Sequence, residues 1–290
     1  MRADLVLEGG GVLGLTFIGA YRALYEAGYR VYRIAGTSVG AFIASLIAAG
    51  FTPEELETMA LNIDFRPFKQ KTFWSHLSGV GRWLSLLIDK GLYRNHGLRE
   101  WLDQKLKERG KDQFQHLPRL KVIATDVTKK RMLILPDDLV DYGLNPEQFS
   151  VALAVQMSTA IPYYFVPIQF HYGTKTSYIV DGGILSNFPI WIFDRKGRPR
   201  WPTFGLKIKD PISLTSQGKT SLIDYTKDLI RTVIDKDESV YLKPGDRVRT
   251  ILIDYDESID ALNFDLSKAT IKTLIASGYQ STKRFLQQFD

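Results

Sequence analysis

The sequence lacks cysteine entirely and contains only four histidines among 290 residues. The absence of cysteine excludes disulfide bonds, thiol nucleophiles and thiolate metal sites, and it favours an intracellular protein. A signal peptide is not predicted, because the N-terminus runs directly into an apolar segment at residues 5–7 without a charged region, an apolar core and a cleavage site. We therefore expect a cytoplasmic or peripheral membrane location.

The uncharged stretch at residues 34–53 is better explained by a buried strand, turn and helix than by a membrane span. The reason is its content of small and polar residues, which are Gly36, Thr37, Ser38, Gly40, Gly50 and Thr52. The net charge of +6 fits either an anionic membrane surface or an ordinary solvated surface. Because no basic run is interleaved with aromatic residues, we expect no nucleic-acid partner.

The N-terminal part of the chain alternates between short apolar segments and helical patterns. Strands are predicted at residues 5–7 and 31–35, and helices at residues 13–27 and 38–49, each helix being followed by a glycine. A capping box with proline at the first helical position begins another helix at residues 52–55. This βαβα alternation predicts an α/β fold, with a parallel sheet covered by helices on both faces.

Later segments extend this pattern. Further strands are predicted at residues 121–125, 132–135, 177–180, 203–208 and 248–253, and further helices at 97–109, from Asn145 to Met157, and at the C-terminus. Residues 65–87 mix aromatic and basic side chains, which favours either an interfacial cover over an acyl-chain pocket or a helical subdomain packed on the core. We expect a single domain over residues 1–290, with a helical, cover-like segment at about 53–110 and a C-terminal strand and helix at about 211–290.

A glycine-rich turn, Gly-Gly-Gly-Val-Leu-Gly at residues 9–14, follows the first predicted strand. This pattern also fits dinucleotide binding, which requires an acidic residue at the end of the second strand, but residues 31–35 run into Gly36 instead. The same turn can present backbone N–H groups to a developing oxyanion. A tight turn without a ligand is the remaining interpretation.

Residues 36–40 form a G-x-S-x-G pattern centred on Ser38, placed after a predicted strand and before a predicted helix. Small residues flank such a serine because the turn is sharp and the strand and helix approach closely. The N-terminal end of the following helix favours negative charge. Ser38 is therefore the candidate nucleophile of an acyl-transfer site.

The order of the histidines disfavours the usual catalytic triad. An α/β-hydrolase has the order Ser, then Asp or Glu, then His, whereas no histidine follows His171 and Ser38 lies very early in the chain. His171 with Asp126 or Asp141 is an outside candidate. The other histidines, which are His76, His96 and His116, are expected at surface or packing positions.

Asp181 is the other candidate base. It ends an apolar strand and precedes Gly182 and Gly183, at the edge where parallel α/β sheets keep their sites. Exclusion of water would raise its pKa from an ordinary value of about 3.9, and direct contact with the serine would make a histidine unnecessary. A carboxylate that only caps a turn is the alternative, and the residues alone leave both readings open.

Together, the motifs at residues 9–14, 36–40 and 181–183 resemble the patatin-like phospholipases in order and setting. Residues 158–167, with their small residues and Phe-x-Pro, and Asn187 and Pro189 fit the same family, so the resemblance covers about residues 4–210. It implies a three-layer α/β/α fold with a mostly parallel central sheet. It also implies hydrolysis of lipid acyl esters, without a metal or a cofactor.

The resemblance assigns a role to each motif. Ser38 would be the nucleophile and Asp181 the proton acceptor of a dyad without histidine. Backbone N–H groups of the glycine loop would form the oxyanion hole, and the residues concerned are Gly9, Gly10, Gly11, Val12 and Gly14. The remaining motif glycines are Gly36, Gly40, Gly182 and Gly183. One departure is Leu13, where many members carry arginine or lysine, so one positive charge near the site is missing.

The expected partner is a lipid or acyl-ester substrate, with contact to a peripheral membrane surface. A general carboxylesterase or acyltransferase on small esters or thioesters would use the same chemistry. A non-catalytic lipid-binding module would keep the fold alone, but the intact Ser38, Asp181 and glycine loop favour an enzyme.

Overall fold

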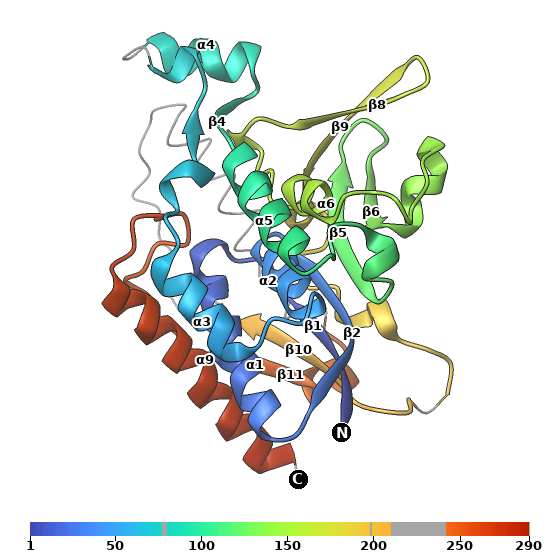
Figure 1. Cartoon of the computed structure of the whole chain (residues 1–290), viewed down its shortest axis with the longest axis vertical. Helices are drawn as coiled ribbons and strands as arrows, with labels where there is room; N and C mark the ends of the chain where they lie inside the picture. The colour runs from blue at the N-terminus through green and yellow to red at the C-terminus, as the bar shows by residue number, and fades with distance from the viewer. Residues whose placement is uncertain (77–79, 198, 210–241, 290) are drawn as a thin grey trace.

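The computed structural model describes residues 1–76, 80–197, 199–209 and 242–289 (Figure 1). Within them, the α-helices are α1 (Thr16–Glu26), α2 (Val39–Ala48), α3 (Pro53–Asn62), α4 (Val80–Ile88), α5 (His96–Glu108), α6 (Val151–Ser158), α8 (Pro244–Arg247) and α9 (Lys268–Phe289). The strands are β1 (Arg2–Leu7), β2 (Arg30–Thr37), β3 (Gln70–Lys71), β4 (Gly91–Arg94), β5 (Leu120–Asp126), β6 (Arg131–Leu135), β7 (Tyr163–Phe165), β8 (Ile168–Tyr172), β9 (Lys175–Asp181), β10 (Thr203–Ile208) and β11 (Thr250–Ile253). The predictions for residues 77–79 and 210–241 fall outside the described residues.

The fold is a three-layer α/β/α arrangement around a mostly parallel sheet, as predicted. The sheet has the strand order β11-β10-β1-β2-β5-β9-β8, with β6 paired to β5. The pairs from β11 to β5 are parallel, whereas β6, β9 and β8 join by antiparallel pairing. A small second sheet of β3, β4 and β7 lies between α4 and the central sheet (Figure 1).

Strand β5 brings the ends of β2 and β9 together. It pairs with β2 through Leu120–Ile123 and with β9 through Ala124–Asp126, while β6 pairs with residues 122–126. Since a strand has only two edges and β6 takes one, β2 and β9 must follow each other along the other edge. Their directions are opposite, so the C-terminal ends of β2 and β9 meet.

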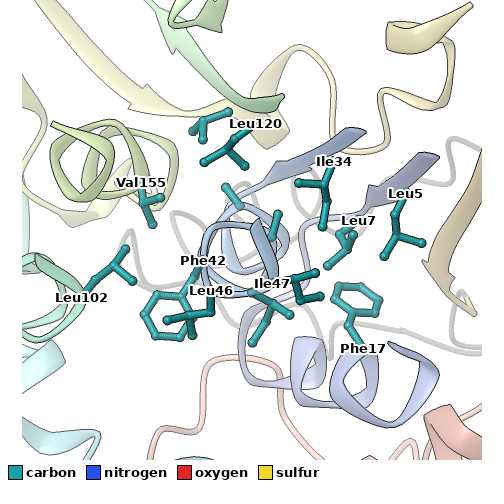
Figure 2. Close-up of a cluster of buried hydrophobic side chains, with 14 of the residues drawn as sticks. Leu5, Leu7, Phe17, Ile34, Phe42, Leu46, Ile47, Leu102, Leu120 and Val155 are labelled. Carbon is teal, nitrogen blue, oxygen red and sulfur yellow. The ribbon is translucent and has the colours of Figure 1, made fainter. Parts of the chain in front are cut away.

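The main hydrophobic core lies between one face of the sheet and the helices that cover it. Strand β1 shows the alternation of a sheet buried on both faces, because Leu5 and Leu7 face α1 and α2, and Val6 faces the opposite side. Figure 2 shows Leu5, Leu7 and Phe17 beside Ile47 of α2. On the opposite face Val6 joins a smaller cluster whose other members are Ala35, Phe188, Ile190 and Phe193.

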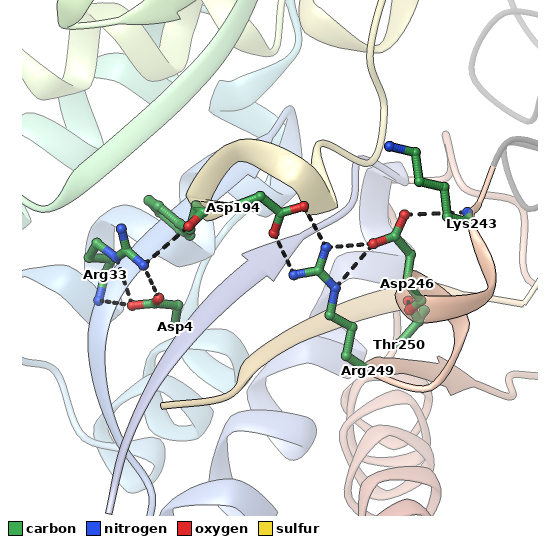
Figure 3. Close-up of polar contacts among 8 residues, drawn as sticks. Asp4, Arg33, Asp194, Lys243, Asp246, Arg249 and Thr250 are labelled. Atoms are coloured by element: carbon green, nitrogen blue, oxygen red, sulfur yellow. Dashed lines mark hydrogen bonds and ion pairs between the residues drawn. The ribbon is translucent and has the colours of Figure 1, made fainter. Parts of the chain in front are cut away.

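Two arginines form ion pairs that join neighbouring segments of the sheet region (Figure 3). Arg33 of β2 donates to the carboxylate of Asp4 on β1, with Nε 3.0 Å from Oδ1, and Asp4 is almost completely buried. Arg249, just before β11, binds both carboxylate oxygens of Asp194 at 2.6 and 2.9 Å. It also pairs with Asp246 of α8. Arg249 therefore joins the turn at Asp194 to the residues just before β11.

Local signals placed most elements correctly. The capping box is confirmed, because the Thr52 side chain accepts the amide of Glu55 and the Glu55 side chain accepts the amide of Thr52. The predicted helix start at Asn145 is wrong: α6 begins at Val151 and is capped by Ser150, whose Oγ accepts the Leu153 amide at 3.2 Å. The predicted helix at 13–27 begins instead as a 3₁₀ turn, η1 (Gly11–Leu15), before α1.

No helix in the described part of the chain is both long enough and apolar enough to cross a membrane. Residues 34–53 instead form the end of β2, helix α2 and the start of α3, as predicted from their small and polar residues. The last helix, α9, lies along α1 and α3 at the outside of the sheet (Figure 1). Within its predicted stripe, Ile271, Leu274 and Ile275 are buried in the main core.

Candidate active site

Ser38 stands on the turn between β2 and α2 in a strained backbone conformation. Its φ of 53° and ψ of −126° lie outside the regions that residues other than glycine ordinarily occupy. Its amide donates to the Ser158 hydroxyl at 2.8 Å, and the side chain of the preceding Thr37 donates to the Ser186 carbonyl at 3.1 Å. The turn at residues 36–40, called the elbow below, is therefore held by hydrogen bonds on both sides of Ser38. Ser38 stands at the N-terminal end of α2.

The glycines around Ser38 are required by close backbone approach. A Cβ on Gly36 would lie 2.4 Å from the carbonyl carbon of Gly40, and a Cβ on Gly40 would lie 2.4 Å from the carbonyl oxygen of Glu8. Gly14, in the glycine loop, is also required by close approach, because a Cβ there would lie 2.5 Å from the Val39 side chain. These contacts press the elbow against the glycine loop.

Asp181 reaches the elbow from the opposite direction. In the pairing of β9 with β5, Asp181 lies opposite Ala124, one residue beyond Ile123, which pairs with Thr37. The prediction placed Asp181 at the edge where parallel sheets keep their sites, and Asp181 does lie beside the C-terminal end of the parallel strand β2, but β9 reaches this place by running antiparallel to β5. Asp181 meets Ser38 because two strands end head to head. Gly182 permits this turn, since a Cβ there would lie 2.4 Å from the Ile123 carbonyl oxygen.

The carboxyl group of Asp181 is buried and only partly satisfied. Its side chain is nearly inaccessible, and burial raises its pKa from 3.8 to about 7, against the lowering effects of the Ser38 hydroxyl and the Gly183 amide. Oδ1 accepts the Gly183 amide at 2.8 Å, while Oδ2 has no hydrogen-bond partner among the described residues. The approach of Ser38 therefore falls short of a full hydrogen bond, and Oδ2 is available to take a proton.

The glycine loop offers two backbone amides beside Ser38. Among the predicted donors, the Gly9 amide donates to the Asn187 carbonyl at 3.1 Å, and the Val12 amide donates to the Ala261 carbonyl at 2.9 Å. In the described part of the chain, the amides of Gly10 and Gly11 have no such acceptor. The position for a Cβ on Gly9 is 3.2 Å from the Cβ of Ser38, so the loop lies directly against the serine.

Two positioning residues come from outside the three glycine motifs. Ser158 at the end of α6 accepts the Ser38 amide and donates to the Ile123 carbonyl, so it joins the elbow to β5. Asn187 links the two glycine turns, since its side chain donates to the Gly9 carbonyl at 3.3 Å and lies beside Gly183. Both residues belong to the parts of the sequence that carry the family resemblance, Ser158 at the start of residues 158–167 and Asn187 with Pro189.

A buried ion pair anchors the base of the glycine loop. Glu8, immediately before Gly9, lies 3.2 Å from the Lys207 ammonium, and its other oxygen accepts the Ile208 amide at 2.8 Å. The Lys207 side chain is completely buried. Charges this well buried are tolerated only when paired, so the loop and β10 are fixed in one arrangement. Leu13, the departure noted in the sequence, packs into the main core.

The outside candidate with histidine is not assembled. His171 pairs with Thr176 at 2.9 Å on the β8–β9 hairpin, Asp126 accepts the Tyr142 hydroxyl at 2.6 Å, and Asp141 pairs with Arg131 at 2.7 Å. Within the residues described, no group of three histidine, aspartate or glutamate side chains is placed to hold a metal ion.

Comparisons with known proteins agree with the fold and the motifs. A family model described as patatin-like phospholipase matches residues 5–194. The uncharacterized protein YqhO of Bacillus subtilis is 36% identical over 293 residues, covering 100% of this chain and 99% of that protein. A probable lipid hydrolase, 463L of invertebrate iridescent virus 6, is 24% identical over 204 residues, covering 64% of this chain and 61% of that protein.

Among solved structures, VipD from Legionella pneumophila superposes with a TM-score of 0.57 at 20% identity. The match covers 99% of this chain and 67% of the VipD chain. At this identity the likeness concerns the fold alone.

Proposed function

The chain belongs to the patatin-like phospholipase family, whose members are lipid acyl hydrolases, and we propose that it cleaves fatty-acyl esters of phospholipids or related lipids by a Ser38–Asp181 dyad. The observation that carries the dyad is the head-to-head meeting of β2 and β9. It brings a strained serine against a buried, partly unsatisfied carboxyl group, next to a glycine loop in which the Gly10 and Gly11 amides have no backbone acceptor among the described residues. The viral relative's printed description as a probable lipid hydrolase supports the substrate class.

In the proposed reaction, Ser38 Oγ attacks the ester carbonyl carbon while Asp181 Oδ2 accepts the hydroxyl proton. The carbonyl oxygen becomes an oxyanion held by the amides of Gly10 and Gly11. The intermediate collapses, the bond to the leaving alcohol breaks, and the alcohol takes the proton from Asp181. Water, deprotonated by Asp181, then attacks the acyl-enzyme. The bond between the acyl carbon and Ser38 Oγ breaks, Ser38 takes the proton back from Asp181, and the fatty acid leaves.

The elevated pKa of Asp181 supports this role. A carboxylate with an ordinary pKa is too weak a base for a serine hydroxyl, whereas a pKa of about 7 is matched to catalysis near neutral pH. The same burial excludes water from the Ser38–Asp181 contact. It therefore allows the dyad to operate without a histidine between the two groups.

The dyad is tested with Ser38→Ala and Asp181→Asn, compared with Ser45→Ala, which removes a buried hydroxyl within α2. We expect both dyad variants to lose nearly all hydrolysis of an acyl ester while keeping the wild-type circular dichroism spectrum. A fluorophosphonate probe should label the wild type and Ser45→Ala but not Ser38→Ala. Absence of labelling in the wild type would favour a lipid-binding module. Full activity of either dyad variant would refute the proposed dyad.

The substrate class needs a separate comparison. Phospholipid vesicles, a short p-nitrophenyl ester and an acyl thioester should be offered at matched acyl concentration. We expect the vesicles to give the highest kcat/KM. A preference for the short ester or for transfer from the thioester would instead indicate a general carboxylesterase or an acyltransferase with the same dyad.

We further propose that α4 and Phe73, which precedes it in the chain, contact the lipid surface. Figure 1 shows α4 projecting at the end of the molecule away from α9. Two apolar side chains at the end of α4 face solvent, with Leu87 76% and Ile88 52% exposed, and Phe73, which precedes the helix, is 76% exposed. Apolar side chains on a projecting helix, with the exposed Lys90 beside them, are typical of an interfacial contact.

The contact is tested with Phe73→Ala/Leu87→Ala in co-sedimentation with anionic vesicles. Val140→Ala/Leu252→Ala is the matched control, because those side chains are 61% and 52% exposed elsewhere. We expect the first variant to bind vesicles several-fold more weakly and the control to bind as the wild type does. Equal binding by all three proteins would assign α4 to packing alone.

A further inference from the structure

A cavity of about 520 Å³ lies apart from Ser38 and Asp181, which are not among its lining residues. Its walls come from the turn between α4 and β4, the N-terminal end of α5, helix α6 and strand β8. In Figure 1, β4 and α5 lie between α4 and the central sheet, to which β8 belongs. The volume is within the range of pockets that bind small ligands.

The polar wall of this cavity is strongly cationic. It carries Lys90, Arg94 and Arg99, against a single carboxylate, Asp89, which pairs with Arg94 at 3.3 Å. Within the described residues, Lys90 and Arg99 form no ion pair. The Lys90 ammonium lies 5.2 Å from the centre of the Tyr178 ring, another lining residue. Two unpaired positive charges on a concave wall create an attractive field for an anion.

The end of α5 adds further donors. Asn95 stands at its N-cap but does not cap it, because its side chain donates to the Gln156 carbonyl at 3.0 Å and to Thr159 at 3.1 Å. No acidic residue lies in the first turn, so the positive end of the helix is uncompensated. The Gln156 amide donates to His96 Nδ1 at 3.0 Å, which leaves the ring hydrogen on Nε2.

Most of the remaining lining residues are apolar, among them Leu153, Met157, Ile168 and Phe170, and Gln169 is a further polar one. The cavity thus joins a cationic, donor-rich end to a hydrocarbon-lined end. We propose that it is a binding site for a phosphate ester, with the phosphate held by Lys90, Arg94 and Arg99 and the organic part resting on α6 and β8. The site is independent of the Ser38 chemistry, and free phosphate esters and phospholipid headgroups share the chemistry it recognises.

The test measures binding of glycerol 3-phosphate to the full chain by calorimetry at constant ionic strength in chloride. The variant Lys90→Gln/Arg99→Gln removes the two unpaired cations, both of which are exposed, so it should fold normally. Arg22→Gln/Lys283→Gln makes the same charge change on α1 and α9. We expect the first variant to bind more than about tenfold more weakly, because it loses charge-assisted hydrogen bonds to the phosphate, and the control to bind normally.

Vesicles containing phosphatidic acid distinguish the two sources of phosphate. If Arg99→Gln alone, which keeps Lys90 at the interfacial contact, loses affinity for both vesicles and glycerol 3-phosphate, the site takes headgroups; if it loses only the latter, the site takes free phosphate esters. Unchanged glycerol 3-phosphate affinity in this variant, equal binding of acetate, or no binding by the wild type at millimolar concentration would overturn the proposal. Hydrolysis of an uncharged short ester, measured in parallel, reports on the dyad separately.

Discussion

The pH dependence of catalysis gives the sharpest test of the buried Asp181. In the proposed mechanism only the deprotonated carboxylate can accept the Ser38 proton, so kcat/KM should follow its ionisation in the free enzyme. Burial raises this pKa from 3.8 to about 7, because the carboxylate loses solvation that the Gly183 amide replaces only at Oδ1. The role of Asp181 is therefore tested by measuring kcat/KM while the pH is changed across neutrality.

The size of the effect follows from the pKa. With a pKa of about 7, the carboxylate fraction is about 0.1 at pH 6 and about 0.9 at pH 8, so kcat/KM should rise about tenfold. An aspartate with its ordinary pKa of 3.8 would be fully ionised at both values, and the profile would be flat. These two outcomes differ far beyond the error of a rate measurement.

The assay uses a short acyl ester, with the released product quantified after quenching at one fixed pH, so that the readout itself does not titrate. The rate of fluorophosphonate labelling provides a second profile, because it depends on the same Ser38 deprotonation. Asp181→Asn measured in the same buffers gives the background. A flat profile from pH 6 to 8, or a midpoint below pH 5, would refute Asp181 as the base in its buried form.

Three further predictions concern stability and positioning. Asp181→Asn should raise the free energy of unfolding at pH 8 by at most about 4 kcal/mol and leave it unchanged near pH 3. The reason is that a raised pKa of an aspartate destabilises the folded state only at pH values above the pKa of the unfolded chain, 3.8. Chemical denaturation at both pH values measures this, and equal stabilisation at both would contradict it. Gly36→Ala should cost about 2–3 kcal/mol through its backbone clash, whereas Gly245→Ala, with open space around it, should be neutral by the same measurement. Ser158→Ala should lower kcat and cost about 1–3 kcal/mol by leaving the Ser38 amide unsatisfied, with Ser45→Ala as the control; a kcat equal to that of the control would deny Ser158 a positioning role.

Much of the fold was accessible from local patterns. The alternation at residues 5–49 predicted β1, α1, β2 and α2, because hydrophobic period and terminal glycines are properties of neighbouring residues. The start of α6 was mispredicted: Asn145-Pro146 has the composition of a helix start, but the helix begins after Ser150, whose hydroxyl accepts the Leu153 amide. The sequence predicted a strand at residues 177–180 but not its antiparallel direction, because strand pairing depends on distant residues.

The candidate site divides in the same way. The sequence by itself determined which chemical groups are present: a serine between small residues, an aspartate before two glycines, and a loop of bare amides. Tertiary structure decided that β2 and β9 end head to head on β5, that Gly10 and Gly11 keep their amides free among the described residues, and that Ser158 holds the elbow. It also decided the basicity of Asp181, because a pKa depends on what surrounds the carboxyl group in space, and those surroundings come from segments far apart in the chain.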